Sequence, residues 1–557
     1  MAPAAPRYPK QKAAAMQLLN QGRYAEAAAM LAPLCAKQPR DPESHGALGY
    51  CLLHLGRLAE AVAAYRRVVR LVPRAWRAHA DLANALRFAG SFQEAVDANQ
   101  EAIRLNPSAA VLWDNLGICL CSQGRIDEAA AAHRKAMELD PASFRAHSNL
   151  LLTLHYQAAA DPAVLLADHR AWGAAHGVAG AAPHFQNRRD PERRLRVGYL
   201  SADLRTHSVA YFLEPLLAHH DHAQVEVYAY AHLPGGDATT ERLHGWVDQW
   251  RWVAGLAPHA LVRRLRDDRL DLLVELGGHT SSELLVACAL RAAPVQVTYL
   301  GYPDTTGVPA LDYRLVDEIT DPPGAEARCT ERLVRLPGCF LCFCPSAEAP
   351  PVAPLPAATR GHVTFGSFNN LAKINVAVVD LWCQLLARLP AARLLVKNPS
   401  FDDPPTRGRY AAWFAARGID AGRVELRGPT EQVADHLALY GEVDIALDTF
   451  PYNGTTTTCE ALWQGVPVVT LAGNLHMGRV GASLLQAAGH PEWVAATEAE
   501  YLAAATGLAA DVDRLGRLRA GLRQAVAASP LADGAAFVPR VEAAYRALWR
   551  GWCATPA

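Results

Sequence analysis

Four consecutive threonines, from Thr455 to Thr458, follow an Asn-Gly pair and open an apolar run with helical spacing. The turn at Asn453-Gly454 would aim the first backbone N–H groups and the threonine hydroxyls outward from the helix start. Free N–H groups and the positive end of the helix dipole favour a phosphate group there. Glu460, which follows in the first turn, could accept hydrogen bonds from ribose hydroxyls. The spacing Thr457-x-x-Glu460 is equally that of a capping box, which needs no ligand.

Other candidate residues of this half stand near the same predicted sheet edge. Asn370 and Lys373 flank the turn after the strand in "HVTFGSFNNLAKI". Lys373 and Lys397 are the only lysines after Lys135, and a compact mobile charge suits a diphosphate, although a solvated surface lysine is the commoner case. His436, in "VADHLALYG", could stack on a nucleobase, and a helical surface histidine is the ordinary alternative.

The preceding half offers acid–base candidates, each just past a predicted strand. His207 follows "LRVGYLSADLRT", where a histidine at neutral pH can take or position a proton. "VELGGHTSS" presents Glu275 and His279, and "YLGYPDTTG" presents Tyr302 and Pro303. Glycines at strand ends permit close backbone approach to a ligand, but they also serve ordinary turns.

Composition excludes several classes of function. The net charge of −1 gives no reason to expect electrostatic binding to nucleic acid or to an anionic membrane. We find no apolar run of membrane-spanning length and no signal-peptide pattern, and the 12 scattered cysteines favour a reducing cytoplasm. No Walker lysine loop appears, and no Gly-x-Gly-x-x-Gly follows a strand, so ATP hydrolysis and NAD chemistry lack their fingerprints.

A metal site is not expected either. The triplet Asp511-Val-Asp513 lies in a segment that reads as a helical surface. The cluster "CFLCFC", with Cys339, Cys342 and Cys344, has aromatic and apolar neighbours and no partner pair at zinc-site spacing. We therefore expect a buried strand there.

The elements that position these residues begin with a repeat. Glycine recurs at positions 22, 56, 90 and 124 and proline at 39, 73, 107 and 141, both in steps of 34. This period is that of tetratricopeptide repeats, in which the glycine sits between two helices and the proline follows the second. Four repeats fill residues 8 to 141, and "FRAHSNLLLTLHY" reads as a capping helix. The concave side of such arrays binds protein segments, although a purely structural array or a dimer interface is the alternative.

Strands and helices then alternate in two successive blocks. The strand candidates are "LRVGYLSADL", "VEVYAYA", "LDLLVELGG", "VQVTYLGYP" and "YRLVDEIT", followed after a Pro/Ala-rich stretch by "HVTFGSFNN", "RLLVKNP", "VELRG", "VDIALDTF" and "PVVTLAG". Intervening helices indicate parallel, doubly wound sheets with a cleft between the blocks. Ligands of such sheets bind past the carboxyl ends of the strands, where all candidate residues fall.

Four motifs, in order behind the repeats, carry a family resemblance: "LRVGYLSADLRTHSV", "LGYPDTTG", "SFNNLAKI" and "LDTFPYNGTTTTCEALWQGVPVVT". With them the chain resembles a bacterial member of the O-GlcNAc transferase family. The resemblance implies a tetratricopeptide superhelix followed by an α/β GT-B fold of two Rossmann-like lobes. It implies five successive parts of the chain. Repeats with a capping helix occupy 1–157, a linker 158–190, a catalytic lobe 191–355, a nucleotide-sugar-binding lobe 356–525 and a C-terminal helix 526–557.

The same resemblance implies roles for individual residues. His207 matches a proposed catalytic base, and Lys373 matches the lysine that contacts the donor diphosphate. His436 matches the histidine that stacks on the nucleobase, Thr456 and Thr457 match the pair that binds phosphate, and Glu460 holds the ribose. Asn370, Gly454, Thr455 and Thr430 complete the expected nucleotide-sugar site, with Glu275, His279, Tyr302 and Pro303 in the cleft.

We therefore expect an inverting protein O-glycosyltransferase, without cofactor or metal, that moves GlcNAc from UDP-GlcNAc to serine or threonine of proteins held by the repeats. Its compartment would be the cytoplasm, with no nucleic-acid or membrane partner. The segment "LPGCFLCFCP" is more similar to the SPINDLY branch, whose members use GDP-fucose. Two further hypotheses compete with these: a scaffold whose lobes bind nucleotide but are inactive, and a GT-B transferase that acts on glycans or small molecules.

Overall fold

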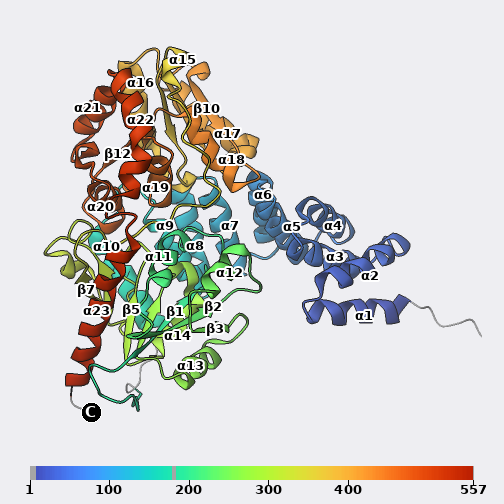
Figure 1. Ribbon diagram of the computed structural model, residues 1–557. Helices are drawn as coiled ribbons and strands as arrows, with labels where there is room; N and C mark the ends of the chain where they lie inside the picture. Colours follow the sequence, from blue (N-terminus) through green and yellow to red (C-terminus); the bar gives the residue numbers. More distant parts are fainter. Residues whose placement is uncertain (1–7, 178–182, 556–557) are drawn as a thin grey trace, which may run out of the picture. The chain divides into compact units, whose positions relative to one another are not determined.

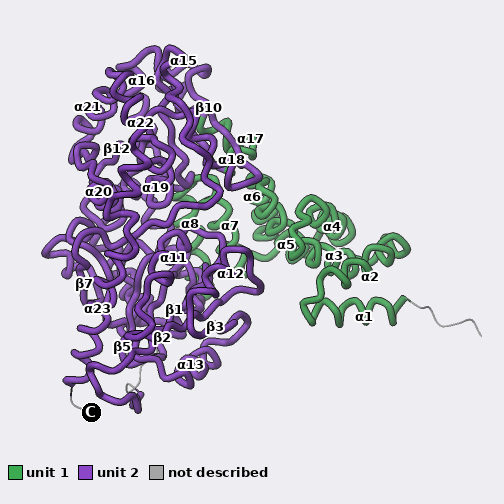
Figure 2. Tube along the Cα trace, in the orientation of Figure 1, with its two compact units in different colours: residues 1–141, 399–410 green, residues 142–398, 411–557 purple. Residues whose placement is uncertain are grey.

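The computed structural model describes residues 8–177 and 183–555. They belong to two compact units, which Figure 2 colours separately. One unit contains residues 1–141 and 399–410, and the other contains residues 142–398 and 411–557. None of the described helices is long and apolar enough to cross a membrane.

The first unit confirms the tetratricopeptide repeats. Gly22, Gly56, Gly90 and Gly124 turn the chain between paired helices with φ of 73°, 71°, 77° and 72°, values at which an L side chain is strained. The alanines at 27, 61, 95 and 129 have no exposed area, because the helices cross there. The helices are α1 Tyr8–Asn20, α2 Tyr24–Lys37, α3 Pro42–His54, α4 Leu58–Leu71, α5 Trp76–Phe88, α6 Phe92–Leu105, α7 Ala110–Ser122 and α8 Ile126–Leu139.

A short stretch from much later in the chain belongs to the same unit. Residues 399–410 contain η4 Pro399–Asp402 and the start of α17 Pro404–Ala415. The Asp403 carboxylate accepts from the backbone N–H of Gln93 at 3.2 Å, and Arg409 donates to the carbonyl of Gln123. Nothing in the sequence pattern indicated that this stretch would join the repeats.

The second unit contains two parallel sheets, as expected for two Rossmann-like lobes. The first sheet has the order β3-β2-β1-β4-β5-β6-β7. Its strands are β1 Leu195–Ser201, β2 Val225–Ala231, β3 Gln249–Trp252, β4 Leu272–Glu275, β5 Val295–Thr298, β6 Tyr313–Val316 and β7 Arg332–Arg335. Its helices are α11 Ala210–Ala218, α12 Ala238–His244, α13 Pro258–Asp267 and α14 Ser282–Ala289 (Figure 1).

The second sheet has the order β10-β9-β8-β11-β12-β13. Its strands are β8 Thr364–Ser367, β9 Arg393–Lys397, β10 Val424–Arg427, β11 Ile445–Leu447, β12 Val468–Leu471 and β13 Val494–Ala495. Its helices are α15 Ala357–Arg360, α16 Val376–Arg388, α17, α18 Val433–Ala438, α19 Thr456–Trp463, α20 Val480–Ala487, α21 Glu498–Ala509 and α22 Val512–Ala527. In each sheet the strand order reverses once, between β1 and β4 and between β8 and β11, and such switch points are where doubly wound sheets bind ligands.

Three strands were missed, and one expected strand is absent. The missed strands β3, β7 and β13 contribute polar or very short segments to sheet edges. The "CFLCFC" segment is buried, but it forms no strand. Its backbone N–H groups bond outside the ladder instead, from Phe340 to the Asp317 carboxylate, from Phe343 to the Leu531 carbonyl and from Cys344 to the Tyr211 carbonyl.

The segment expected as a linker contains a helix, α10 Pro162–His176. Asp161 caps it by accepting from the Ala163 N–H at 2.8 Å, and Trp172 is fully buried. The expected capping helix of the repeats, α9 Phe144–Leu154, lies in the second unit. Its Leu151 shares a core with Trp172 and with Leu273 of β4, so apolar burial holds both helices to the first lobe.

The C-terminal helix α23 Gly534–Ala554 packs against α11 and β5 of the first lobe. Figure 1 shows it in red beside these elements. The chain therefore returns to the first lobe after completing the second, which the expected boundaries did not indicate.

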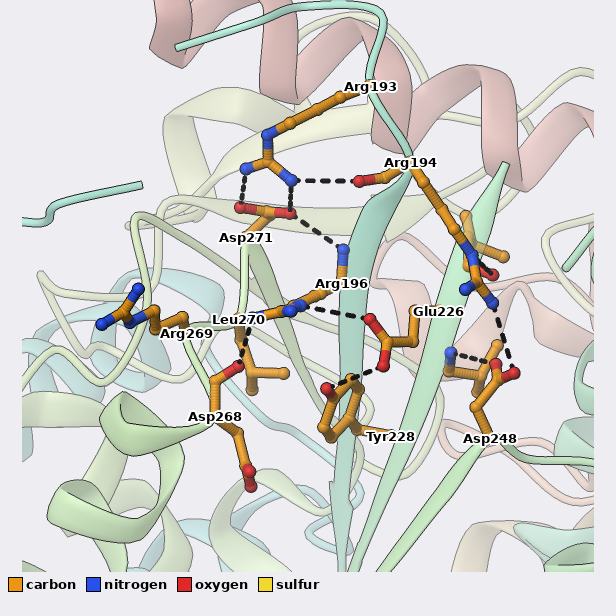
Figure 3. A network of polar contacts seen from close by, with 12 residues as sticks. Arg193, Arg194, Arg196, Glu226, Tyr228, Asp248, Asp268, Arg269, Leu270 and Asp271 are labelled. Atoms are coloured by element: carbon orange, nitrogen blue, oxygen red, sulfur yellow. Dashed lines mark hydrogen bonds and ion pairs between the residues drawn. The ribbon is translucent and has the colours of Figure 1, made fainter. Parts of the chain in front are cut away.

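The amino edge of the first sheet is closed by ion pairs, shown in Figure 3. Arg193 pairs with the buried Asp271, which also accepts from the Arg196 N–H at 2.9 Å. Arg196 Nε donates to Glu226 at 3.1 Å, and Arg194 donates to Asp248 at 3.2 Å. The loops at the opposite, carboxyl edge carry the candidate site residues.

Candidate functional site

Asp448, the residue after β11, organises the turn that leads into the four threonines. Its buried carboxylate accepts from the backbone N–H groups of Thr449 at 2.8 Å and Gly454 at 2.6 Å, and from the Thr470 hydroxyl at 2.7 Å. Residues 449–457, which we call the threonine turn, are thereby folded back over the end of β11. Burial raises the pKa of Asp448 to about 6.

The turn requires glycine at position 454 because there is no room for a Cβ atom. A Cβ there would lie 2.6 Å from Thr457 Oγ1 and 2.8 Å from Asn369 Oδ1. These two atoms are themselves hydrogen-bonded at 3.0 Å, which ties the threonine turn to the loop after β8.

The start of α19 is not a capping box. Its N-cap, Thr455, makes no side-chain cap, and the Thr457 hydroxyl donates to Asn369 instead of capping the helix. Thr458 donates to the Gly454 carbonyl at 3.3 Å. Among the described residues, the hydroxyls of Thr455 and Thr456 have no protein partner, and both residues are partly exposed. The uncapped helix start can therefore receive an anion.

Lys373 ends the short helix η3 Leu371–Lys373, which the Asn370 side chain caps by accepting from Ala372 N–H at 3.0 Å. Its ammonium group donates to the Asn453 carbonyl at 2.7 Å and lies 3.8 Å from the centre of the Tyr452 ring. Burial lowers the pKa of Lys373 to about 8, and the charge of Asp448 opposes that shift. The two expected parts of the site, Lys373 and the threonines, are thus in contact through one turn.

His436 and Glu460 are also brought together. Lys397 Nζ donates to His436 Nδ1 at 2.9 Å, so the neutral ring carries its proton on Nε2, which lies 3.2 Å from Glu460 Oε2. With both ring nitrogens engaged, the partly exposed imidazole offers a face rather than an edge to a ligand. Glu460 lies in the second turn of α19 and not in the first, and Tyr440 also donates to it at 3.4 Å.

Thr430 lies apart from these contacts, in the loop between β10 and α18. It is partly exposed.

His207 precedes α11, past the end of β1. Its Nδ1 accepts from the Val209 N–H at 3.3 Å and lies 3.6 Å from Asp203 Oδ1. Burial lowers the pKa of His207, partly offset by the charge of Asp203. As the ring lies here, Nδ1 is the acceptor and Nε2 carries the proton. To act as a base through Nε2, the ring would need the other neutral tautomer, in which Nδ1–H donates a hydrogen bond to the Asp203 carboxylate and no longer accepts from Val209.

Glu275, at the end of β4, is fully buried. Its Oε1 accepts from the N–H groups of Gly277 and Gly278 at 2.5 and 2.6 Å, and burial raises its pKa to about 7. A Cβ on Gly278 would lie 2.3 Å from the Tyr302 Cβ, so this glycine permits backbone packing against a neighbouring loop.

His279, Tyr302 and Pro303 are buried behind the sheet edge, beneath α9 and α10. His279 Nδ1 lies 3.0 Å from the Ser148 hydroxyl and its Nε2 2.8 Å from the Thr306 carbonyl. Tyr302 lies 2.8 Å from His169 Nε2. Both polar groups are satisfied within the protein, which argues against direct contact with a substrate.

The two lobes approach each other around these residues. Tyr452 of the threonine turn stacks on Tyr156 at the end of α9, with ring centres 5.5 Å apart. Burial raises the pKa of Tyr211 in α11, and the charge of Glu460 in the second lobe adds to that shift. Elements of the two lobes therefore lie close together on this side of the second unit.

Several residues of the site were not foreseen: Asp448, Asn369, Asn453, Tyr452, Tyr440 and Lys397. Asp448 ends the predicted strand "VDIALDTF", and Lys397 is one of the two late lysines. Those two signals could have identified them, whereas the others have contacts that only folding reveals.

Comparison with known proteins agrees with this architecture. The model described as "Glycosyl transferase family 41" matches residues 178–343 and 356–541, and a tetratricopeptide model matches 12–75 and 80–144. The family model covers both doubly wound lobes, and this match shows that the protein is a glycosyltransferase. The chain belongs to glycosyl transferase family 41.

A solved mutant of the Thermobaculum terrenum O-GlcNAc transferase is 38% identical with a TM-score of 0.87, covering 93% of this chain and 98% of that one. The probable UDP-N-acetylglucosamine–peptide N-acetylglucosaminyltransferase SPINDLY of Petunia hybrida is 46% identical over 66% of this chain. The corresponding SEC protein of Arabidopsis thaliana is 29% identical over 65%. The chain spans about two fifths of the length of these curated relatives, 40% and 38%.

Proposed function

We propose that the protein is an inverting O-glycosyltransferase that moves GlcNAc from UDP-GlcNAc to serine or threonine hydroxyls of proteins. The observation that carries the proposal is the contact of Lys373 with the threonine turn, 2.7 Å from the Asn453 carbonyl, beside an uncapped helix start. A positioned ammonium and free backbone N–H groups at one point suit a departing diphosphate, and they would stabilise its charge without a metal ion. The names of the similar proteins support the sugar and the protein acceptor.

In this proposal His436 presents its ring face to the base and Glu460 accepts from the ribose. The acceptor oxygen bonds to the anomeric carbon while the bond from that carbon to the diphosphate oxygen breaks, which inverts the sugar. The hydroxyl proton passes to His207 or to a phosphate oxygen. Lys373 and the N–H groups of Thr455 and Thr456 then hold the leaving diphosphate.

Calorimetric titration of the protein with UDP and with GDP, without added metal, tests the site. UDP should bind with a 1:1 stoichiometry, and K373M or E460Q should weaken it. A preference for GDP would replace UDP-GlcNAc by GDP-fucose with the same site. Binding of neither nucleotide would rule the site out.

A transfer assay separates the enzyme from a nucleotide-binding scaffold. With UDP-GlcNAc and a mixture of protein acceptors, the wild type should transfer sugar and K373M should not. Wild-type protein that binds UDP tightly but transfers neither GlcNAc nor fucose would support the scaffold.

A further inference from the structure

A cavity of about 490 Å³ lies at the amino ends of β8, β9 and β10. The sheet is parallel, so this cavity and the threonine turn lie at opposite edges, separated by the length of the strands, about 10 Å at ~3.3 Å per residue. Its size is that of a small-molecule site. The arginines, the histidine and the glutamates that line it are Arg360, Arg393, Arg423, His362, Glu425 and Glu442.

The two lining carboxylates are already paired. Arg427, which does not line the cavity, donates to Glu442 at 2.6 Å and to Glu425 at 2.5 Å. Arg360 lies 3.7 Å from Glu442 as well. The negative charges of Glu425 and Glu442 are therefore compensated by Arg427 and Arg360.

Two lining arginines keep an uncompensated charge. Within residues 8–177 and 183–555, no carboxylate lies within ion-pair distance of Arg393 or Arg423. Arg423 is held in place by carbonyls alone, donating to Ala392 at 3.0 Å and to Leu386 and Leu389 at 2.8 Å. Arg393 is exposed at the first position of β9. One guanidinium is held by backbone carbonyls and the other is exposed, and both line the same cavity.

Thr364, which also lines the cavity, is 6% exposed. Its hydroxyl is buried and has no hydrogen-bond partner among the described residues. The wall of the cavity therefore contains a polar group whose hydrogen-bonding capacity is unused.

The corresponding edge of the first sheet differs. There Arg193, Arg194 and Arg196 each reach a carboxylate, as Figure 3 shows. The second sheet has the same kind of strand order, but among the described residues its Arg393 and Arg423 have no carboxylate partner.

We propose that this cavity binds a small anion with phosphate or carboxylate groups, and that it does so while a nucleotide occupies the other edge of the sheet. Guanidinium groups bind both kinds of anion through charge-assisted hydrogen bonds. The proposal is independent of the donor sugar.

The test is calorimetric titration of the full chain, saturated with UDP, with inorganic pyrophosphate and separately with citrate at low ionic strength. At least one of them should bind with a 1:1 stoichiometry. Binding of pyrophosphate alone would identify a phosphorylated ligand, and binding of citrate alone a carboxylate. R393E should weaken binding by about tenfold or more, and the milder R393Q by less.

The matched control is R263E, at an exposed arginine of α13 in the other lobe. It should leave anion binding unchanged, and R393E should leave UDP affinity unchanged. The proposal fails if neither anion binds the UDP-saturated protein, or if R263E weakens binding as much as R393E. If the wild type does not bind UDP, that result counts against the proposed nucleotide site. The anion titration is then run without UDP, with the same two variants.

Discussion

At the scale of single residues, the chemistry depends on how burial sets protonation. Burial lowers the pKa of Lys373 to about 8, so its amine is mostly charged only below that pH. Glu275 behaves in the opposite way, because burial raises its pKa to about 7 and makes it neutral below that pH. Each shift gives a measurable pH dependence.

For Lys373 we expect sugar transfer to fall above about pH 8, by about tenfold per pH unit once the amine is neutral. The reason is that the neutral amine no longer stabilises the leaving diphosphate. K373R should move this alkaline limb upward, because guanidinium stays protonated, while lowering kcat through its different shape. The measurement is kcat against pH for both proteins. K135M, at an exposed lysine of the repeats, is the control and should match the wild type.

For Glu275 we expect a pH-dependent stability. Its folded pKa of about 7 exceeds the ordinary 4.5, so the stabilising contribution of the proton is complete below pH 4.5 and is lost as pH rises through 7. E275Q keeps hydrogen-bond acceptors for Gly277 and Gly278 without the charge. Above pH 7 the free energy of unfolding of E275Q should exceed that of the wild type by up to about 3 kcal/mol. E275Q should therefore unfold at a higher temperature than the wild type there.

Thermal unfolding at several pH values measures this effect. E498Q, at an exposed glutamate in the first turn of α21, should change nothing. Equal pH dependence in E275Q and the wild type would show that Glu275 is not the group responsible.

At the scale of elements, the threonine turn is fixed by the contact of Gly454 with Thr457 and Asn369. G454A adds a Cβ within 2.6 Å of Thr457 Oγ1, so the turn must open and separate α19 from the loop after β8. UDP affinity should fall by about tenfold or more, and the free energy of unfolding should fall by about 1–3 kcal/mol. Calorimetry with UDP and thermal unfolding measure the two effects.

G516A is the matched control, since nothing lies within 4 Å of a Cβ on that helical glycine of α22. It should be neutral or slightly stabilising. UDP binding by G454A at wild-type affinity would mean that the turn does not contact the nucleotide.

At the scale of the whole molecule, the repeats form one compact unit together with residues 399–410, and the lobes form the other. The first boundary along the chain falls at residue 141. A protein lacking residues 1–141 keeps α9, whose Ser148 and the following His155 contact His279 and Asp304 at 3.0 Å. A protein lacking residues 1–157 loses these contacts and the buried Leu151. The two truncations differ by little in length but should differ in folding.

We expect the 142–557 protein to bind UDP within about threefold of the full chain and to lose most transfer to protein acceptors. The 158–557 protein should unfold several degrees lower or aggregate, because it leaves buried polar groups unpaired. Calorimetry, thermal unfolding and acceptor labelling test these outcomes. Undiminished labelling of proteins by the 142–557 protein would show that the repeats are not needed to hold the protein acceptors.

The sequence by itself determined the repeats, the position of most strands along the chain and the sheet edge at which the candidate residues lie. These features depend on local periodicity and on residues that directly follow strands, such as Lys373 after β8 and the threonines after β11. Local patterns record them because helix pairs and parallel strands bury apolar residues at fixed spacing.

Only the tertiary structure decided which groups meet. Asp448 holds Gly454, Lys373 reaches Asn453, Lys397 orients His436, and α9 joins the first lobe. Each of these contacts joins separate loops or helices, and sequence periodicity does not encode such pairings. In the sequence, His279 and Glu460 are both polar candidates at the end of a strand or helix. In the structure, His279 is buried and both of its ring nitrogens have hydrogen-bond partners. Its environment depends on how α9 and α10 pack, which no local pattern specifies.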